Sequence, residues 1–370
     1  MTPFVDRALP EQERQMEVRT PPVGFYGNGL EAPERREGDD LPRVVAFGGG
    51  TGMSTLLSGL RRYTDRLTAV VTVTDNGGSS GRLRNDFEIV PPGDIRNCLI
   101  ALAEVDPLLI EAFQYRFTEG EFRGHCFGNL FITILTRIVG SFEGSIREMN
   151  RLLNVRGKVL PAASERVSLI AHHPDGTKST GEVQIIRSGK KIVRVELRPS
   201  PVRLSAEIEE AVSQADLFLF GPGSLFTSVI PNLLIDGIME AIRRTGKPRV
   251  YIGNIMTQPG ETLGLRLSDH VRALRSHVGD GFPDVVIAQV GEIPPQILDR
   301  YAGEGAEPVS MDLDQKEFQG IEIIASNFFT GGEIVRHDPS VLARTIHDRF
   351  LSGVRGRGGR NEPMALRNGI

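Results

Sequence analysis

The chain has 370 residues, of which 39% are hydrophobic and 24% are charged, and its formal net charge is −4 at pH 7. This composition is typical of a globular protein, and the small net charge does not favour a nucleic-acid partner or a membrane surface. The cysteines, Cys98 and Cys126, are too few for a disulfide scaffold or a zinc finger, and no apolar run approaches the roughly 18 residues of a membrane helix. We therefore expect a cytoplasmic protein without zinc and without membrane insertion.

The two ends of the chain differ in composition from the rest. Residues 1–41 are rich in Pro, Glu, Arg and Gly without a sustained apolar period, and residues 353–370 are basic and rich in Gly. Such segments cannot bury enough apolar surface to offset the entropy of ordering. We predict a flexible N-terminal arm over 1–41, one α/β domain over 42–352 and a flexible basic tail over 353–370.

Short apolar runs alternate with helical patterns along the domain. Each run is rich in Val, Ile, Leu and Phe and lacks polar alternation, which is typical of strands that are buried on both faces. Helical spacing follows most runs, as at Met53, Leu56, Leu57 and Leu60. This alternation predicts an α/β fold with a mostly parallel sheet covered by helices on both faces. The predicted strands are Arg43–Phe47, Leu67–Thr74, Asp216–Phe220, Arg249–Ile252 and Val285–Val290.

One segment, at about residues 164–200, breaks this alternation. Three runs there, Arg166–Ala171, Gly181–Arg187 and Lys191–Arg198, have the composition of antiparallel strands. The links between them contain Asp-Gly and Ser-Gly pairs, which favour hairpin turns. We predict a small antiparallel β insertion within the α/β body.

A glycine-rich loop joins the first predicted strand to the first predicted helix. The stretch VVAFGGGTGMSTLLSGL fits neither G-x-G-x-x-G nor G-x-x-x-x-G-K-[ST], which argues against NAD and against a triphosphate loop. Its glycines still let the backbone approach a ligand, and the helix start offers free N–H groups and a positive dipole end. The loop therefore predicts phosphate or nucleotide binding, with a plain tight turn as the alternative. Its members are Gly48, Gly49, Gly50, Thr51 and Gly52.

A second permissive loop follows the second predicted strand, in TVTDNGGSSGRLR. Asp75 stands where open α/β folds place a ribose-binding acid. Backbone N–H groups and hydroxyls beyond it could form an anion nest, with an arginine supplying charge. The alternative is a surface loop with an Asx-turn. The residues assigned to this loop's site are Asp75, Asn76, Ser79, Ser80 and Arg82.

Further polar clusters stand at helix starts and strand ends. Asp94 alone is explained as a helix N-cap, but Asp75 and Asp94 together could hold Mg²⁺ with substrate phosphate oxygens. We find no G-x-S-x-G elbow, HExxH or CxxC, so no catalytic residue is assigned. All these clusters would meet at one edge of the sheet. The remaining nucleotide-site candidates are Asn97, His125, Asn129, Gly221, Gly223, Ser224 and Asn254.

Taken together, these stretches closely resemble the gluconeogenesis factor proteins, the YvcK-like branch of the CofD (2-phospho-lactate transferase) family. The resemblance covers about residues 43–290. It is carried, in chain order, by GGGTGMSTLLSGL, VTVTDNGGSSGRLR, PPGDIRNCL, FQYRF, GHCFGNL, FGPGSLFTSVIPNLL and NIMTQPGET.

The resemblance implies a Rossmann-like fold and a nucleotide-type site. Its YvcK-like branch is associated with UDP-sugar binding, gluconeogenic growth, cell shape and envelope synthesis, and its members self-associate, so a homo-oligomer is an open expectation. In its transferase branch an acidic pair holds Mg²⁺, and Asp75 and Asp94 are similar to that pair by motif position. Many family members have two consecutive acids where this chain has Asp75 and Asn76, so one carboxylate is missing here.

Two functions follow as hypotheses. The first is a regulatory factor that binds a UDP-sugar or another nucleotide-type ligand, because phosphate-type loops occur without a clear nucleophile. The second is a Mg²⁺-dependent transferase of a phospholactyl-type group from a nucleotide-activated donor. Aromatic residues are only 6% of the chain and Trp is absent, which counts against a flavin. The sequence leaves open which nucleotide or sugar binds and whether turnover occurs.

Overall fold

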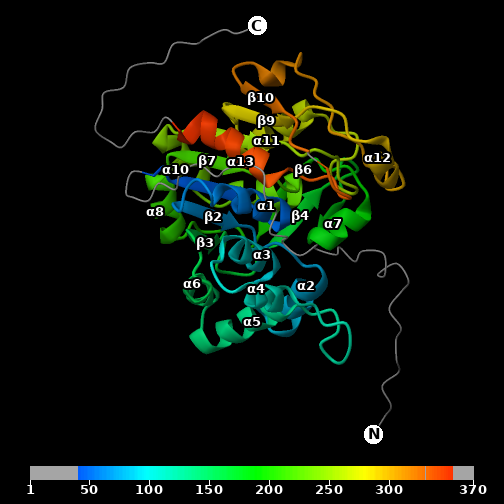
Figure 1. Ribbon diagram of the computed structural model, residues 1–370. Coiled ribbons are helices and arrows are strands. Elements are labelled where there is room, and N and C mark those ends of the chain that lie inside the picture. Colours follow the sequence, from blue (N-terminus) through cyan, green and yellow to red (C-terminus); the bar gives the residue numbers. More distant parts are fainter. Residues whose placement is uncertain (1–40, 330, 353–370) are drawn as a thin grey trace. The chain divides into compact units, whose positions relative to one another are not determined.

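A computed structural model describes residues 41–329 and 331–352 (Figure 1). The predicted arm up to residue 40 and the predicted tail from residue 353 lie outside the described residues.

The main sheet has seven strands, all parallel, in the order β10-β9-β8-β7-β1-β2-β3 (Figure 1). On one side of β1 the sheet continues through β2 to β3. On the other side it continues through β7, β8 and β9 to β10. This is a doubly wound sheet, and its topological switch point lies between β1 and β7. The strands are β1 (Val44–Gly48), β2 (Leu67–Val71), β3 (Lys158–Pro161), β7 (Leu217–Phe220), β8 (Arg249–Ile252), β9 (Val285–Gln289) and β10 (Glu322–Ser326).

The central strands are covered on both faces. Every residue of β1 and of β7 is buried, as their uninterrupted apolar runs predict. The ring of Phe47 stacks on that of Phe220 with centroids 5.2 Å apart, and Phe282 meets Phe220 edge-on at 4.9 Å. These three rings fix the register of β1 against β7 at the switch point.

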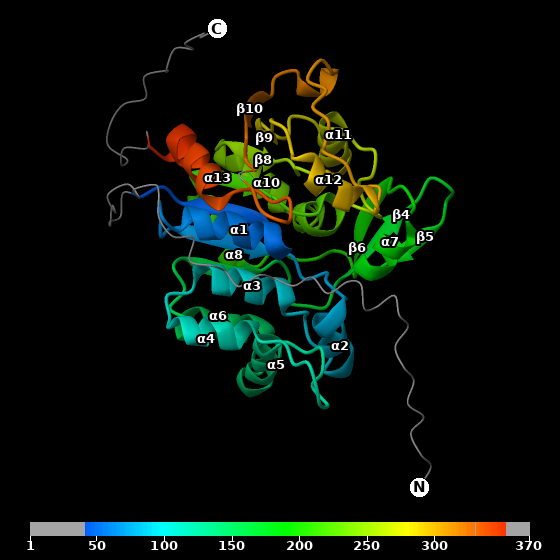
Figure 2. The same ribbon diagram turned by 45° about the vertical axis from the view of Figure 1, so that its right-hand side comes forward.

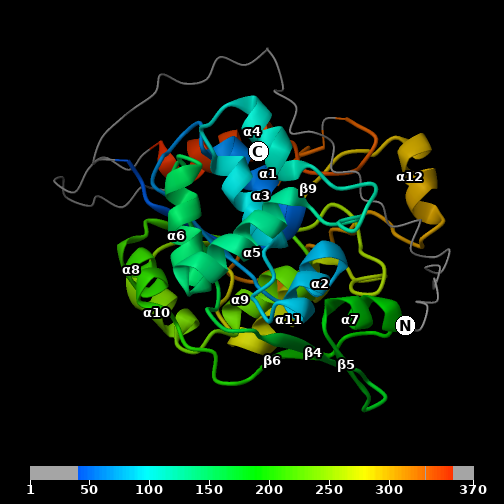
Figure 3. The same cartoon turned by 90° about the horizontal axis from the view of Figure 1, so that it is seen from below.

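The helices that border the sheet form two groups. Helix α1 packs against α3 and α13, whereas α8 packs against α10. Figure 2 shows α1 and α13 close together, and in Figure 3 α8 and α10 lie together and apart from them. This arrangement places helices around a doubly wound sheet as the alternation of the sequence predicts. These helices are α1 (Gly50–Leu60), α3 (Gly93–Leu102), α8 (Ala206–Gln214), α10 (Ile238–Thr245) and α13 (Pro339–Ile346).

The other helices connect these elements. A π-helical turn, η2, comes directly before α9 and packs against it, and α5 packs against α4 and α6. None of the helices in residues 41–329 and 331–352 has both the length and the apolar character needed to cross a bilayer. The bounds are α2 (Gly78–Asp86), α4 (Pro107–Gln114), α5 (Phe127–Val139), α6 (Phe142–Leu152), η2 (Leu225–Val229), α9 (Ile230–Leu233), α11 (Leu267–Val278), α12 (Pro295–Ala302), η3 (Lys316–Phe318) and η4 (His347–Leu351).

The predicted strands of the parallel sheet are confirmed, with small shifts at their ends. Two edge strands, β3 and β10, were not predicted. β3 has only four residues, Lys158–Pro161, and begins with an exposed lysine. In β10 no residue is fully buried. A four-residue run in β3 and the weak burial of β10 both give less signal than the longer buried runs of the central strands.

The antiparallel insertion is confirmed, but one of its predicted strands is wrong. Its sheet has the order β5-β4-β6, with β4 at Ser168–His172, β5 at Lys178–Thr180 and β6 at Arg194–Arg198. The run predicted as a strand at Gly181–Arg187 instead forms α7 (Glu182–Ser188). Gly181 has φ +84° and ends the strand, and only Ile185 of the helix is fully buried. Tertiary packing thus overrides the β-branched composition.

We expect Phe220→Ala to lower the free energy of unfolding by about 3–5 kcal/mol, because it removes a buried ring that two other rings contact. Chemical denaturation measures this change. Leu108→Ala is the control, since Leu108 is 72% exposed and its truncation should change stability by less than about 0.5 kcal/mol. Equal effects of the two substitutions would contradict this account of the core.

Candidate functional site

Two glycine loops meet at the switch point, beyond the carboxyl ends of β1 and β7. A Cβ atom on Gly52 would lie 2.4 Å from the carbonyl oxygen of Pro222, so only glycine allows this approach. Asn232 donates from Nδ2 to the Gly48 carbonyl at 3.0 Å and fixes the first loop from the side of α9. The predicted glycines of both loops are therefore brought together, where open α/β sheets bind their ligands.

The start of α1 presents backbone N–H groups to this site. Its N-cap, Gly49, has no side chain to cap the helix, and no acidic residue lies in the first turn. An acid from another helix occupies the position instead: Asp94 accepts a hydrogen bond from the Gly50 N–H, and a Cβ on Gly49 would lie 2.6 Å from Asp94 Oδ2. The interpretation of Asp94 as an N-cap is wrong, because Pro92 precedes α3 at that position.

Asp75 lies beside the start of the same helix, α3. Its Oδ1 accepts the Gly77 N–H at 2.8 Å, which is the predicted Asx-type turn, and a Cβ on Gly93 would lie 3.2 Å from its Oδ2. Burial raises the pKa of Asp75. Burial, and then the charge of Asp75, raise the pKa of Asp94 to about 7. The structure therefore brings the two predicted acids into electrostatic contact.

The serines and the arginine that follow β2 mostly bind other parts of the protein. Ser79 and Ser80 are buried, and Ser80 hydrogen-bonds the Asp75 carboxylate. Arg82 donates from both Nη1 and Nη2 to the Arg123 carbonyl oxygen at 3.1 Å. Direct ligand contact by these side chains stays a prediction.

A buried polar network joins this loop to the start of α5. The Ser79 hydroxyl accepts from Asn129 Nδ2 at 3.2 Å and lies 3.3 Å from His125 Nδ1. Arg96 donates to Asn129 Oδ1 at 2.9 Å and to Asn97 Oδ1 at 2.7 Å. Burial lowers the pKa of His125. Four predicted site residues are thus held in one network, with the Arg96 guanidinium as its cation.

The loop after β8 completes the site from a third side. Asn254 accepts the Gly223 N–H at 3.4 Å and donates to Gln258, whose amide donates to Ser224 Oγ at 2.9 Å. Glu261, 7% exposed, accepts from Thr227 Oγ1 at 3.0 Å. Predicted residues of the β7 and β8 loops are therefore hydrogen-bonded to one another.

Two acids at this site were missed from the sequence. Burial, with the charges of Asp75, Asp94 and Glu261, raises the pKa of Glu182 well above its ordinary value. Burial raises the pKa of Glu261 to about 7. Glu261 follows directly on NIMTQPG, so its place in that motif was a usable signal. Glu182 carried no such signal, because it belongs to the segment that was predicted as a strand.

The donor set at Asp75 and Asp94 fits a Mg²⁺ ion. Magnesium is commonly held by one or two carboxylates together with substrate phosphates, and these two acids stand beside the glycine loop. Within the described residues, no group of three or more His, Cys, Asp or Glu side chains has the geometry of a metal site. Any ion would thus need the ligand's own oxygens, and it would supply charge neutralisation there.

A cavity of about 570 Å³ lies elsewhere, at the amino ends of β8 and β9. Lys247 and Arg249 line it, but Lys247 is paired with Asp216 at 3.3 Å and Arg249 with Asp284. Its charges are therefore satisfied within the protein, and we assign no function to it.

Known proteins share both the sequence and the fold. The profile of the CofD family, described as 2-phospho-L-lactate transferase CofD, matches residues 44–329. A gluconeogenesis factor of Bacillus subtilis is 45% identical over 309 residues, covering 83% of this chain and 98% of that protein. A putative gluconeogenesis factor of Thermotoga maritima is 43% identical over 312 residues, covering 82% and 98%. A crystal structure of a Bacillus halodurans protein matches with a TM-score of 0.80 at 46% identity, covering 82% and 99%.

A doubly wound α/β protein, with several of the predicted site residues gathered at its switch point, is thus the class that the fold defines. Within that class, the chain belongs to the CofD family.

The raised pKa of Asp94 predicts a stability that depends on pH. In the folded state this carboxyl holds its proton up to about pH 7, against an ordinary value of 3.8, so the free energy of unfolding falls as pH rises between the two values. We expect Asp94→Asn to be more stable than wild type by about 1–3 kcal/mol at pH 8, with a gain that vanishes near pH ~4.

Denaturation at several pH values with a chelator present measures this difference. Asp299→Asn, at an exposed position of α12, is the matched control and should leave the pH profile of wild type unchanged. A gain for Asp94→Asn that is the same at pH 4 and pH 8 would contradict the electrostatic origin.

Proposed function

We propose that this protein binds a UDP-sugar at the glycine loops between β1 and β7. We further propose that it acts as a regulatory factor linked to gluconeogenic growth, cell shape and envelope synthesis. The observation that carries the binding proposal is the meeting of the two loops beside the start of α1. Relatives called gluconeogenesis factor, 41–47% identical to this chain, support the regulatory part.

The geometry of the loops suits the diphosphate of such a ligand. Backbone N–H groups at a helix start bind anions through hydrogen bonds and the helix dipole, and glycines permit close approach. Gly50, Thr51 and Gly52 are only partly buried, so their backbone is within reach of a ligand. The phosphates would then lie at the first turn of α1.

Asp94 decides under which conditions an anion can bind there. An ionised carboxylate at the Gly50 N–H would repel phosphate, whereas a protonated carboxyl or a bridging cation would not. Because the pKa of Asp94 is about 7, protonation of this carboxylate near neutral pH costs little free energy. The acid beside the loop is therefore compatible with diphosphate binding.

Isothermal titration calorimetry with UDP-glucose and UDP-N-acetylglucosamine, with Mg²⁺ present, tests the proposal. We expect wild type to bind at least one of them, and Thr51→Val to bind it about tenfold more weakly, because the hydroxyl in the first turn of α1 is lost. Thr68→Val, at the amino end of β2, is the matched control and should bind as wild type does.

No binding of either UDP-sugar at millimolar concentration, by protein whose unfolding transition is normal, would overturn the proposed ligand. Equal weakening by Thr51→Val and Thr68→Val would mean that the loop of α1 is not the phosphate site.

The second candidate function is a Mg²⁺-dependent transferase of a phospholactyl-type group from a nucleotide-activated donor. The proximity of Asp75 and Asp94 favours it, since one acid could help to hold the ion and the other accept a proton from the acceptor hydroxyl. The name of the matching family profile points the same way.

A mass-spectrometric search for products formed from labelled nucleotide donors and hydroxyl acceptors tests the transferase. If turnover occurs, Asp75→Asn and Asp94→Asn should each slow it by about a hundredfold or more. Turnover that survives both substitutions would exclude this acidic pair from the chemistry.

A further inference from the structure

The first residues of α7 are fastened to the loop that carries Asp75. The Val183 N–H donates to Asn76 Oδ1 at 3.0 Å, and a Cβ on Gly181 would lie 2.2 Å from Asn76 Nδ2. Figures 1 and 3 both show α7 beside α2, the helix that begins directly after this loop. The side chain of Asn76 thus binds the start of α7. Its two contacts there are Gly181 and Val183, and Glu182 lies between them in the chain.

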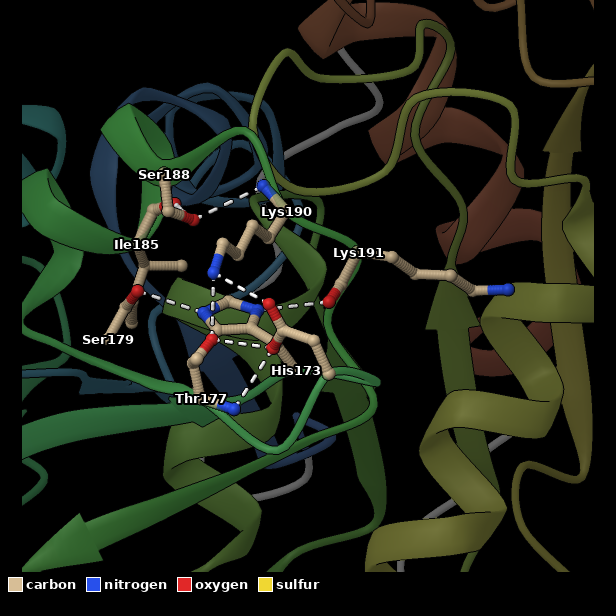
Figure 4. Close-up of polar contacts among 8 residues, drawn as sticks. His173, Thr177, Ser179, Ile185, Ser188, Lys190 and Lys191 are labelled. Carbon is tan, nitrogen blue, oxygen red and sulfur yellow. Dashed lines mark hydrogen bonds and ion pairs between the residues drawn. The ribbon is translucent and has the colours of Figure 1, made fainter.

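The other end of α7 is held by the β insertion itself (Figure 4). The ring of His173 lies between the Lys191 carbonyl oxygen, 3.0 Å from Nδ1, and the Ser179 hydroxyl, 2.8 Å from Nε2. Lys190 follows the helix and donates from Nζ to Asp175 at 2.7 Å and to Thr177 at 2.9 Å. Hydrogen bonds therefore hold the start of α7 at Val183 and the chain just beyond its end at Lys190.

A third element closes on α7 from the loop after β8. A Cβ on Gly260 would lie 2.3 Å from the carbonyl oxygen of Ile186, so this loop packs directly on the helix backbone. The next residue is Glu261, whose Oε1 accepts from Thr227 while its buried Oε2 has no polar partner in the described residues. Buried carboxyl oxygens without a hydrogen-bond partner are rare in native proteins and occur at strained or functional positions.

The carboxyl group of Glu182 faces the charges of the same acids but is less buried than that of Glu261. Across residues 41–329 and 331–352, it has no hydrogen-bond partner, although the charges of Asp75, Asp94 and Glu261 reach it. It is only partly buried, so a ligand can approach it. A carboxyl oxygen repels phosphate but accepts hydrogen bonds from hydroxyl groups in either protonation state.

We propose that Glu182 contacts the ligand and accepts hydrogen bonds from hydroxyl groups of its second sugar, with Asn76 as the residue that positions it. This inference rests on the proposed binding of a nucleoside-diphosphate sugar. In this proposal the diphosphate lies at the start of α1, and the sugar that it carries lies on the side of Asn76 and α7. The insertion then contributes the side chain that distinguishes a nucleotide-sugar from the nucleotide alone.

Calorimetry with UDP-glucose and with UDP, on the full chain, tests this role. We expect Glu182→Gln to weaken UDP-glucose binding about tenfold and to change UDP binding less than about twofold, since only the second sugar loses its acceptor. Glu165→Gln is the matched control at an exposed position before β4 and should bind both ligands as wild type does.

Asn76 gives a second arm of the same experiment. Asn76→Ala removes the acceptor of the Val183 N–H and should reproduce the selective loss of UDP-glucose, whereas Asn76→Asp keeps that oxygen and should retain the preference for UDP-glucose over UDP. A merely structural role of Asn76 would instead weaken both ligands alike.

The outcomes separate the two proposals. If wild type binds both ligands and Glu182→Gln binds UDP-glucose equally well, or loses both ligands to the same degree, the role of Glu182 is refuted and the proposed function stands. If wild type binds neither UDP nor either of the two UDP-sugars, the proposed function fails and the inference fails with it.

Discussion

The contact between the glycine loops of β1 and β7 is the constraint on which the rest of the site depends. Any side chain at position 52 would collide with the Pro222 carbonyl, so the loops approach only as glycine allows. That approach places the start of α1 directly at the switch point, and the π-helical turn after β7 brings Thr227 to Glu261. The loops that follow β1, β7 and β8 converge there because β7 lies directly beside β1 in the sheet and β8 lies beside β7.

Electrostatic strain is concentrated at the same place. Four acids raise one another's pKa or lose solvation, and the nearby Arg96 is itself buried and already bonded to Asn97 and Asn129. An arrangement of this kind lowers folding stability, and such arrangements are concentrated at functional sites. Protonation of the acids relieves this strain, as the raised pKa values of Asp94, Glu182 and Glu261 indicate.

The sequence predicted the parts of the fold that depend on local pattern. The strand Arg249–Ile252, whose last three residues are buried, was placed without error, and the glycine loop at residues 48–52 was read as a strand-to-helix turn. The sequence-based prediction failed at Gly181–Arg187, because Val-Gln-Ile-Ile is compatible with a strand and with a short helix. Only the tertiary contacts of this segment decide between the two. Asp94 was also predicted as a cap of its own helix, since nothing local reveals that it reaches the Gly50 N–H.

The side chain at position 76 shows how one substitution can change the charge of a site and preserve its architecture. Aspartate and asparagine both present an oxygen that can accept the Val183 N–H, so either residue anchors α7. They differ in charge, and a second carboxylate beside Asp75 would raise the repulsion that Asp94 and Glu182 already experience. Because this chain has Asn76, its site carries one negative charge fewer than an aspartate at the same position would give it.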